Sequence, residues 1–312
     1  MTRPLLTVPL GFAPQVVDKV ERLLEVLSAL RDDAFLGEMF VLHGGTALNV
    51  FHERVPRLSV DIDLMFVGAV DVDEMRRLRP QVDGRFREVI GALGYVVRAT
   101  NDEHSGQTYR LQYPGDYVKV DISYLARVAL LEPEVRICEF ADPPVAFPVL
   151  QLPELVAGKI QAMMERVAAR DLYDLYRLAR AHPALFDDSL VRALAVRAIC
   201  ASNRFPFVTR PVDSLDRFEN PTREFTEPLY AMLNADDAPD YEQMLASVAA
   251  WLAPLGGPIA PEAEFMRRLR ESADYRPDLL FANWPDVAGR AAADPVMAWK
   301  VQNLRTLLGE TQ

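Results

Sequence analysis

The periodicity of apolar residues changes near residue 150, and this change limits the fold of the chain more than any other feature. Before that point, short β-rich runs alternate with helical stretches, and after it apolar residues recur at helical spacing. The segment ADPPVAFPVLQLPE between the two parts carries four prolines and is typical of a linker. Because mixed and purely helical segments build different layer architectures, we predict an α+β domain over residues 1–150 and an all-α domain over 151–312.

The expected elements follow from periodicity and turn residues. Amphipathic helices are predicted over 15–31 and 73–93, the second ending at Gly94. The expected strands are 39–42, 60–67, 95–99, 108–113, 117–124 and 135–140. In the second half, helices are predicted over 154–168, 171–181, 187–200 and from about residue 240 onward, and a long loop is expected over 203–228.

Composition excludes several classes of protein. Half of the 312 residues are hydrophobic and a quarter are charged, as in an ordinary folded protein. No apolar run approaches the roughly 18 residues of a membrane helix, and the N-terminus lacks the apolar core of a secretory signal. Two cysteines, Cys138 and Cys200, and four dispersed histidines indicate neither a disulfide framework nor a zinc site. We therefore expect a cytoplasmic protein with no membrane partner.

The net charge of −11 argues against non-specific binding of duplex nucleic acid, whose affinity depends on phosphate neutralisation. It is compatible with a nucleic-acid substrate held by a local basic patch. Only four of the 34 basic residues are lysines, so each of them is informative: Lys19, Lys119, Lys159 and Lys300.

Two aspartates on one apolar strand are the first indication of chemistry. In the segment SVDIDL, side chains alternate across the strand, which directs Asp61 and Asp63 to the same face. Neighbouring carboxylates on an apolar strand repel each other and lose solvation, so the pair is costly unless a cation joins it. Mg²⁺ or Mn²⁺ is the simplest partner, because such an ion takes hard oxygen ligands and also binds substrate phosphates.

A third carboxylate follows on a second predicted strand, where Asp121 lies alone among apolar neighbours. Three carboxylates from two adjacent strands can hold two Mg²⁺ ions, one activating the attacking hydroxyl and one steadying the triphosphate and the leaving pyrophosphate. Taken singly, a D-x-D pair also occurs at strand edges and turn caps, and Asp121 alone could accept backbone hydrogen bonds. The combination of the two strands favours a metal site.

Gly44, Gly45 and Thr46 lie between the strand 39–42 and a short helix, expected to be capped by Thr46 and to end near Glu53. Backbone amides of such a turn and of the following helix start suit phosphate oxygens, with Thr46 adding a hydroxyl. A Gly-Gly pair alone usually marks only a turn. Followed by the carboxylate strands, it indicates nucleotide binding.

These segments resemble the polymerase-β-like nucleotidyltransferases and, more narrowly, the AbiEii/AbiGii toxins of type IV toxin–antitoxin systems. FVLHGGTALNVFH followed by RLSVDIDLMF matches the first motif, and ELVAGKIQAMMERVAARDLYDLYRLA matches the later ones. The resemblance implies a polymerase-β-like domain with a mixed sheet, and an α-helical domain whose first helices complete the active site. It also implies transfer of a nucleoside monophosphate from a nucleoside triphosphate (NTP), with release of pyrophosphate.

The resemblance assigns Lys159 to nucleotide contact and Asp171 to a catalytic or site-organising role. From the residues alone, Lys159 lies at the buried edge of its helix, where a triphosphate could neutralise it. The alternative is a lysine that snorkels at the helix margin. Asp171 could merely cap its helix, and Asp174, one turn further on, is the secondary candidate.

The acceptor and the partners are also implied by the resemblance: the 3′ end of tRNA, arrest of translation, and a cognate antitoxin. Phenylalanines in the second half interleave with arginines and offer a path for RNA, unless they are core aromatics beside a solvated face. The residues are Arg192, Arg197, Arg204, Arg210, Arg217, Arg223, Arg267, Arg268 and Arg270, with Phe205, Phe207 and Phe218. Other hypotheses are nucleotidylation of a small molecule or a protein hydroxyl, and a non-catalytic nucleotide-binding scaffold.

Ser59 precedes Asp61 at the same two-residue step as Asp63 follows it, so we expect its hydroxyl beside the first metal ligand. The related toxins suggest that a partner silences the enzyme by phosphorylating a matching serine. A phosphate there would add about 1.5–2 negative charges next to two carboxylates. Otherwise Ser59 simply ends the loop before the strand.

Overall fold

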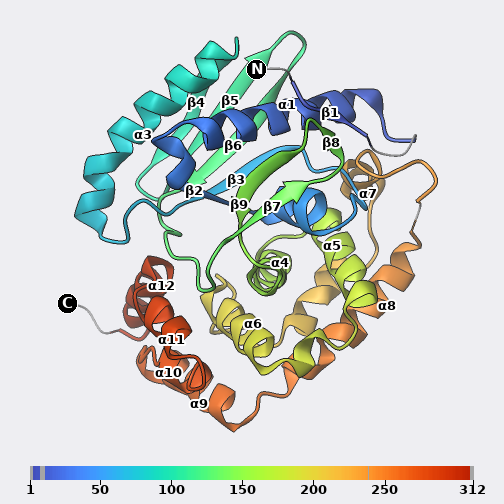
Figure 1. The fold of residues 1–312 in the computed structure, drawn as a ribbon. Coiled ribbons are helices and arrows are strands. Elements are labelled where there is room, and N and C mark those ends of the chain that lie inside the picture. The colour runs from blue at the N-terminus through green and yellow to red at the C-terminus, as the bar shows by residue number, and fades with distance from the viewer. Residues whose placement is uncertain (1–2, 8–10, 238, 310–312) are drawn as a thin grey trace. The chain divides into compact units, whose positions relative to one another are not determined.

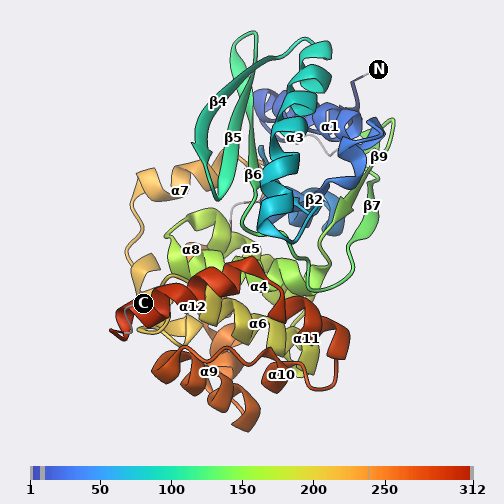
Figure 2. The same cartoon turned by 90° about the vertical axis from the view of Figure 1, so that its left-hand side faces the viewer.

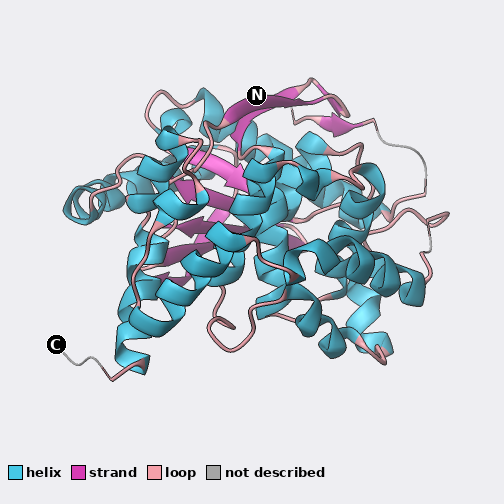
Figure 3. Ribbon diagram, turned by 90° about the horizontal axis from the view of Figure 1, so that it is seen from below, coloured by secondary structure: helices cyan, strands magenta, loops and turns pink. Residues whose placement is uncertain are grey.

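The computed structural model describes residues 3–7, 11–237 and 239–309. The chain forms two compact units: unit 1 comprises Met1–Gln151 and Met232–Asp237, and unit 2 comprises Leu152–Ala231 and Ala238–Gln312. All described strands belong to unit 1, and the regular elements described in unit 2 are helices (Figure 1, Figure 3). The prediction of an α+β chain with a mixed sheet is confirmed. The return of the chain to unit 1 at Met232–Asp237 was not predicted.

A seven-stranded mixed sheet is the frame of unit 1, with the strand order β4-β5-β6-β3-β2-β9-β7. Its members are β2 (Phe40–His43), β3 (Asp61–Phe66), β4 (Val96–Glu103), β5 (Gly106–Tyr113), β6 (Asp116–Ser123), β7 (Glu134–Cys138) and β9 (Val145–Val149). Strand β3 runs antiparallel to β2 and parallel to β6. The two strands that carry the predicted carboxylates are therefore neighbours, as expected.

Two helices, α1 (Pro14–Asp32) and α3 (Val72–Ala92), pack against each other over one face of this sheet (Figure 1, Figure 2). Phe86 of α3 stacks on Tyr109 of β5 with 4.6 Å between ring centroids. Tyr109 pairs with Val120 of β6, which pairs with Ile62 of β3, and all three side chains are fully buried. The alternate residues of these strands, including the aspartates, consequently face the opposite side of the sheet.

The four-proline segment is not a linker, and that prediction is wrong. Ala141–Asp142 forms β8, which pairs with β1 (Leu5–Leu6) in a separate two-stranded sheet. Val145–Val149 forms β9, which lies between β2 and β7 in the main sheet. Its residues alternate as in any half-buried strand, with Phe147 buried, but the prolines concealed that pattern from a reading based on turn residues.

The turn after β2 also differs from expectation. Helix α2 (Gly44–Thr46) begins at Gly44 with His43 as its N-cap residue, and it continues as a π-helix, η2, over Ala47–His52. Thr46 therefore does not cap the helix. Its side chain is fully buried, and its hydroxyl donates a hydrogen bond to the backbone carbonyl of Asp61 over 2.5 Å.

Unit 2 packs around α4 (Leu152–Glu165), which contacts α5 (Ala169–Ala181) and α6 (Ser189–Ala201). The remaining helices are α7 (Arg223–Tyr230), α8 (Tyr241–Leu252), α9 (Ala260–Ser272), α10 (Pro277–Leu280), α11 (Pro285–Ala292) and α12 (Pro295–Leu307). Short 3₁₀ segments are η1 (Leu36–Glu38) in unit 1 and η3 (Leu185–Asp187), η4 (Pro211–Phe218) and η5 (Ala253–Gly256) in unit 2. The expected loop over 203–228 thus contains η4 and the start of α7.

No single helix in the described ranges is long and apolar enough to cross a membrane. One pair of segments, Tyr241–Gly256 and Ala260–Ser272, meets the length and composition criteria only when taken together, and the two are bent by 86°.

Candidate active site

The polar face of the sheet gathers the predicted carboxylates of unit 1. The parallel register pairs Asp63 of β3 with Asp121 of β6, and Asp61 with Lys119. On the other side of β6, Thr108 of β5 pairs with Asp121. Residues paired directly across neighbouring strands point to the same face, so these side chains form one polar surface.

Both carboxylate oxygens of Asp121 have a partner within this surface. The Nζ atom of Lys119 lies 2.5 Å from Oδ2, and the hydroxyl of Thr108 donates to Oδ1 over 2.6 Å. Partial burial opposes the charge on Lys119, but the carboxylates of Asp121, Asp61 and Asp63 outweigh it and raise the pKa of Lys119 above its usual value. Asp121 is thus held as an ion pair.

Sequence reasoning did not assign Lys119 or Thr108 to the site. The alternation that placed Asp61 and Asp63 on one face applies equally to Lys119 and Asp121, which are also two residues apart. Lys119 was therefore within reach of the same argument. Thr108 was not, because its place beside Asp121 depends on the register between β5 and β6.

Gly44 brings the backbone of α2 against the carboxylate of Asp63. Its φ of +72° lies in the left-handed region, which favours glycine. A Cβ added there would lie 2.9 Å from Cγ of Asp63 and closer still to Oδ2. Gly44 is therefore required both for its conformation and for its contact with Asp63, and Gly45 follows it within the first turn.

Thr46 and Ser59 are both buried. Thr46 is fully buried, and its hydroxyl bonds to the carbonyl of Asp61 in β3, whereas contact with a phosphate was expected. Ser59 lies two residues before β3 begins and is only 7 % exposed. Access of a modifying partner to the Ser59 hydroxyl would require this segment to open.

A cavity of about 210 Å³ opens beside the paired aspartates. His43, Asp63, Thr108 and Asp121 line it, together with residues at the turn between β4 and β5: Glu103, Ser105, Gly106 and Gln107. Its volume is below the ~300–1,000 Å³ of pockets that enclose a drug-sized ligand, so it suits a portion of a nucleotide.

The donor set fits a divalent cation in part. Asp61 and Asp63 offer hard carboxylate oxygens on a partly exposed surface, which is the chemistry Mg²⁺ and Mn²⁺ require. However, the described part of the chain contains no group of three or more acidic, histidine or cysteine side chains that could hold a metal ion. Asp121 is bound to Lys119 and Thr108, so its carboxylate would have to leave the ammonium of Lys119 before it could serve as a metal ligand.

The predicted residues of unit 2 form a buried ion cluster. Nζ of Lys159 lies 2.6 Å from Oδ2 of Asp174 and 3.6 Å from Oδ1 of Asp171. Arg166 donates to both oxygens of Asp171 over 2.7 and 3.1 Å. Lys159 is 5 % exposed and the aspartates 1 % or less, so Lys159 does not snorkel. Asp171 is not the helix cap either, because α5 has Ala168 at its N-cap position.

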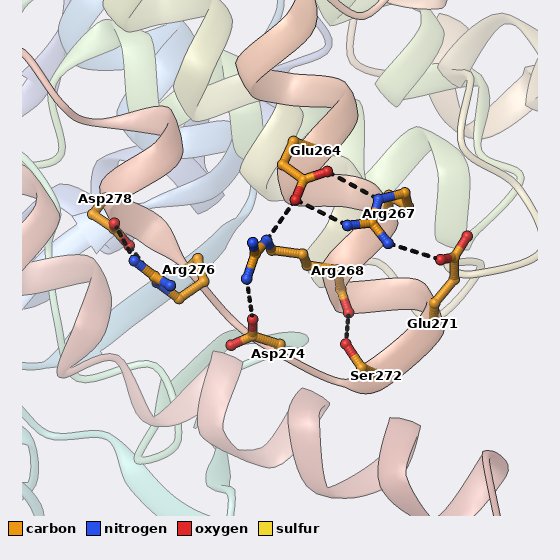
Figure 4. Close-up of polar contacts among 8 residues, drawn as sticks. All are labelled: Glu264, Arg267, Arg268, Glu271, Ser272, Asp274, Arg276 and Asp278. Carbon is orange, nitrogen blue, oxygen red and sulfur yellow. Dashed lines mark hydrogen bonds and ion pairs between the residues drawn. The ribbon is translucent and has the colours of Figure 1, made fainter.

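Most arginines of the predicted path make ion pairs within unit 2, and two of those pairs are largely buried. Arg192 donates to both oxygens of Glu262 over 2.6 and 2.8 Å, and Arg197 pairs with buried Asp294. Figure 4 shows Arg267 and Arg268 sharing Glu264, and their hydrogen bonds lower the pKa of Glu264 to about 2.

The three phenylalanines of that path separate into two groups. Phe205 and Phe218 are core residues, 2 % and 1 % exposed, so the core alternative is right for them. Phe207, by contrast, is 80 % exposed.

Comparison with known proteins gave one family match and several structural likenesses. The model of the family described as "Nucleotidyl transferase AbiEii toxin, Type IV TA system" matches residues 25–247. No curated protein matches the sequence. The fold is similar to that of MenT4, a nucleotidyltransferase toxin from Mycobacterium tuberculosis H37Rv, with a TM-score of 0.60 and 20 % identity over 94 % of this chain and 93 % of that one.

Two structures from Helicobacter pylori, a putative nucleotidyltransferase and JHP933, have TM-scores of 0.49 and 0.48 with 15 % and 16 % identity. Each match covers 78 % of this chain. It covers 96 % of the putative nucleotidyltransferase and 93 % of JHP933. At 20 % identity, the likeness to MenT4 concerns the fold alone.

Proposed function

Because the chain belongs to the AbiEii family of nucleotidyltransferase toxins from type IV toxin–antitoxin systems, we propose that it transfers a nucleoside monophosphate from an NTP to the 3′ end of tRNA, in the cytoplasm, and so blocks translation. The observation that supports the chemistry is the register of Asp63 with Asp121, beside the close approach of Gly44. This arrangement places carboxylates next to backbone amides that can bind the phosphates of a triphosphate.

In this proposal Asp61, Asp63 and Asp121 would hold Mg²⁺ or Mn²⁺. When bound, the cation supplies charge neutralisation at the phosphates and acidifies the attacking hydroxyl. The missing side chain of Gly44 lets the backbone of the Gly44–Gly45 turn approach Asp63, and backbone amides of such a turn suit phosphate oxygens. Thr46 acts as a positioning residue, since it fixes the strand of Asp61 through a hydrogen bond to that carbonyl.

We also propose that Lys159 contacts the nucleotide and that Asp171 has a catalytic or site-organising role, with Asp174 as the secondary candidate. Two buried carboxylates beside Lys159 hold its ammonium in one orientation, and an ammonium is a common partner of nucleotide phosphates. The role of Asp171 and Asp174 is to hold Lys159 in that orientation.

Phe207 supports an RNA acceptor. Two hydrogen bonds hold the loop that carries Phe207. The buried Lys300 ammonium donates to the backbone carbonyls of Ser202 and Phe205, each over 2.7 Å. Arg204, in the same loop, is exposed and makes no ion pair with any residue the structure describes. An exposed aromatic ring beside a free guanidinium on a rigid loop suits the stacking of an unpaired base, such as those at the 3′ end of tRNA.

The experiment that tests the proposal is incubation of the purified protein with each labelled NTP and Mg²⁺, separately with total RNA, with protein fractions and with small metabolites. We expect label at RNA 3′ ends, and a higher KM for RNA but not for NTP in Phe207→Ala, with Phe207→Trp close to the parent. Label confined to a protein or a small molecule would replace tRNA as the acceptor. Absence of label from every fraction with every NTP would refute the transferase proposal.

Regulation by a cognate antitoxin is part of the same proposal. Phosphorylation of Ser59 would place about 1.5–2 negative charges at the start of the strand that carries Asp61 and Asp63 and would compete with the triphosphate. The burial of Ser59 adds a condition, because a kinase can act only on a conformation in which the segment before β3 has opened.

A further inference from the structure

A row of three cationic side chains crosses the outer strands of the sheet in unit 1 and ends beside the carboxylates. Arg98 of β4 pairs in register with Arg110 of β5, and Arg110 pairs with Lys119 of β6. Lys119 in turn pairs with Asp61 of β3. Strands β4, β5 and β6 run side by side (Figure 2), and directly paired residues share a face, so the row lies on the polar face of the sheet.

Three like charges in direct register are unfavourable for a sheet, because cations opposite each other on neighbouring strands repel. Lys119 has a counter-ion in Asp121. Arg98 and Arg110 are both exposed, and neither makes an ion pair with a residue that the structure describes. Protection of an open sheet edge explains a charge on β4, the outermost strand, but not one on β5, which is paired on both sides. The two arginines therefore have charge available for an external anion.

The guanidinium of Arg110 is already oriented. It lies over the ring of Tyr117, 4.9 Å from the ring centroid. A guanidinium above an aromatic ring is held by a cation–π contact, and its in-plane N–H groups stay available for bidentate hydrogen bonds to a phosphate.

We propose that Arg98 and Arg110 bind the phosphate backbone of the acceptor RNA and lead its strand toward the carboxylates. This inference rests on the proposed function, because it assigns the surface on which the acceptor of that transfer lies. It places an RNA contact in unit 1, on the same sheet as Asp61, Asp63 and Asp121.

The position and openness of the row favour RNA over the nucleoside triphosphate as the anion. Three strand spacings separate Arg98 from Asp61, so the row extends over about 14 Å of the sheet. A triphosphate bound at the carboxylates lies nearest Lys119, whereas a polynucleotide carries phosphates along the whole row. Neither arginine lines the cavity beside the paired aspartates, and an open surface suits a strand that runs over the protein better than an enclosed small molecule.

The test is the salt dependence of tRNA binding, measured by the fluorescence anisotropy of labelled tRNA with the full chain. The variant Arg98→Gln/Arg110→Gln removes both charges and keeps polar side chains of similar length. We expect it to raise the Kd for tRNA about tenfold at low salt, which is about 1.4 kcal/mol. The slope of log Kd against log salt concentration should fall by about 0.7–0.9 for each phosphate contact that is lost. The KM for NTP should stay that of the parent.

Two further variants separate a local contact from net charge and from structure. Arg76→Gln/Arg77→Gln removes the same charge from α3, on the other face of the sheet, where the two side chains are 65 % and 71 % exposed, and should change neither the Kd nor the slope. Arg98→Lys/Arg110→Lys keeps the charge and should recover most of the affinity. The melting temperature of Arg98→Gln/Arg110→Gln should equal or slightly exceed that of the parent, because repulsion between paired cations is relieved.

The outcomes distinguish failure of this inference from failure of the proposed function. If Arg98→Gln/Arg110→Gln binds tRNA as the parent does, or if the control on α3 weakens binding equally, the two arginines are not an RNA site. A raised KM for NTP with an unchanged Kd for tRNA would assign the row to the triphosphate instead. In each of these cases, transfer to RNA by the parent protein leaves the proposed function standing. If the parent neither binds nor labels tRNA, the proposed function is wrong and this inference fails with it.

Discussion

Removal of Lys159 is expected to destabilise unit 2 strongly. The substitution Lys159→Met keeps the length and apolar stem of the side chain but deletes the ammonium that lies 2.6 Å from Asp174. The larger loss falls on Asp174, which is 1 % exposed, because the ammonium lies closer to it than to Asp171, at 2.6 Å against 3.6 Å. Breaking a buried ion pair by removing one partner costs about 3–5 kcal/mol, and because Asp171 keeps Arg166 we expect about 3 kcal/mol.

That loss is a large fraction of the ~5–15 kcal/mol that stabilises a typical domain. It can be measured by urea denaturation followed by far-ultraviolet circular dichroism, with Arg223→Met as the control in the same unit. Arg223 is 90 % exposed and lies 4.0 Å from Glu227, so its removal should change the free energy of unfolding by less than about 1 kcal/mol.

The double variant Lys159→Met/Asp174→Asn removes both charges of the pair and should recover at least half of the lost stability. A loss below about 1 kcal/mol for Lys159→Met alone would show that the two aspartates are not buried ions, and the reasoning would fail. Once the double variant is folded, its NTP affinity tests the nucleotide contact of Lys159 separately from its structural role.

Three further predictions concern unit 1. Gly44→Ala should lower the free energy of unfolding by about 1–2 kcal/mol from the left-handed φ alone, and more if Asp63 cannot move aside, as measured by urea denaturation. Burial opposes ionisation of Asp33, but hydrogen bonds from Leu36 and Arg85 outweigh it and lower its pKa, so its contribution to stability is present above the unfolded pKa of about 3.9 and is lost as pH falls through the folded value. Unfolding titrations between pH 5 and 3 should show a smaller loss for Asp33→Asn than for the parent. Ser59→Glu should lower nucleotide transfer strongly while Ser59→Ala is tolerated, and equal activity of the two would remove the proposed switch.

Local sequence patterns predicted those features of the site that lie within single elements. Alternation placed Asp61 and Asp63 on one face because Ile62 and Leu64 needed burial on the other. Helix α1 was recovered to within one residue at each end, since its apolar residues follow the helical period without a break.

The features that could not be predicted from the sequence depend on pairing between elements that are distant in the chain. The register that sets Thr108 against Asp121 joins two strands through backbone hydrogen bonds, which no local pattern encodes. The partner of Arg192 could not be predicted for the same reason, because it is Glu262, 70 residues away in the chain. Prolines misled the prediction at β9, where the backbone is a strand although the composition is typical of a linker.

The measurement that tests the central claim most directly is label transfer from NTP by Asp61→Asn and Asp63→Asn, compared with the parent protein over a titration of Mg²⁺. We predict that both variants lose transfer at every Mg²⁺ concentration. Their melting temperatures should equal or slightly exceed that of the parent, because each substitution relieves repulsion between carboxylates. If both variants are folded and still transfer nucleotide in a Mg²⁺-dependent way, the paired strands β3 and β6 are not the catalytic centre.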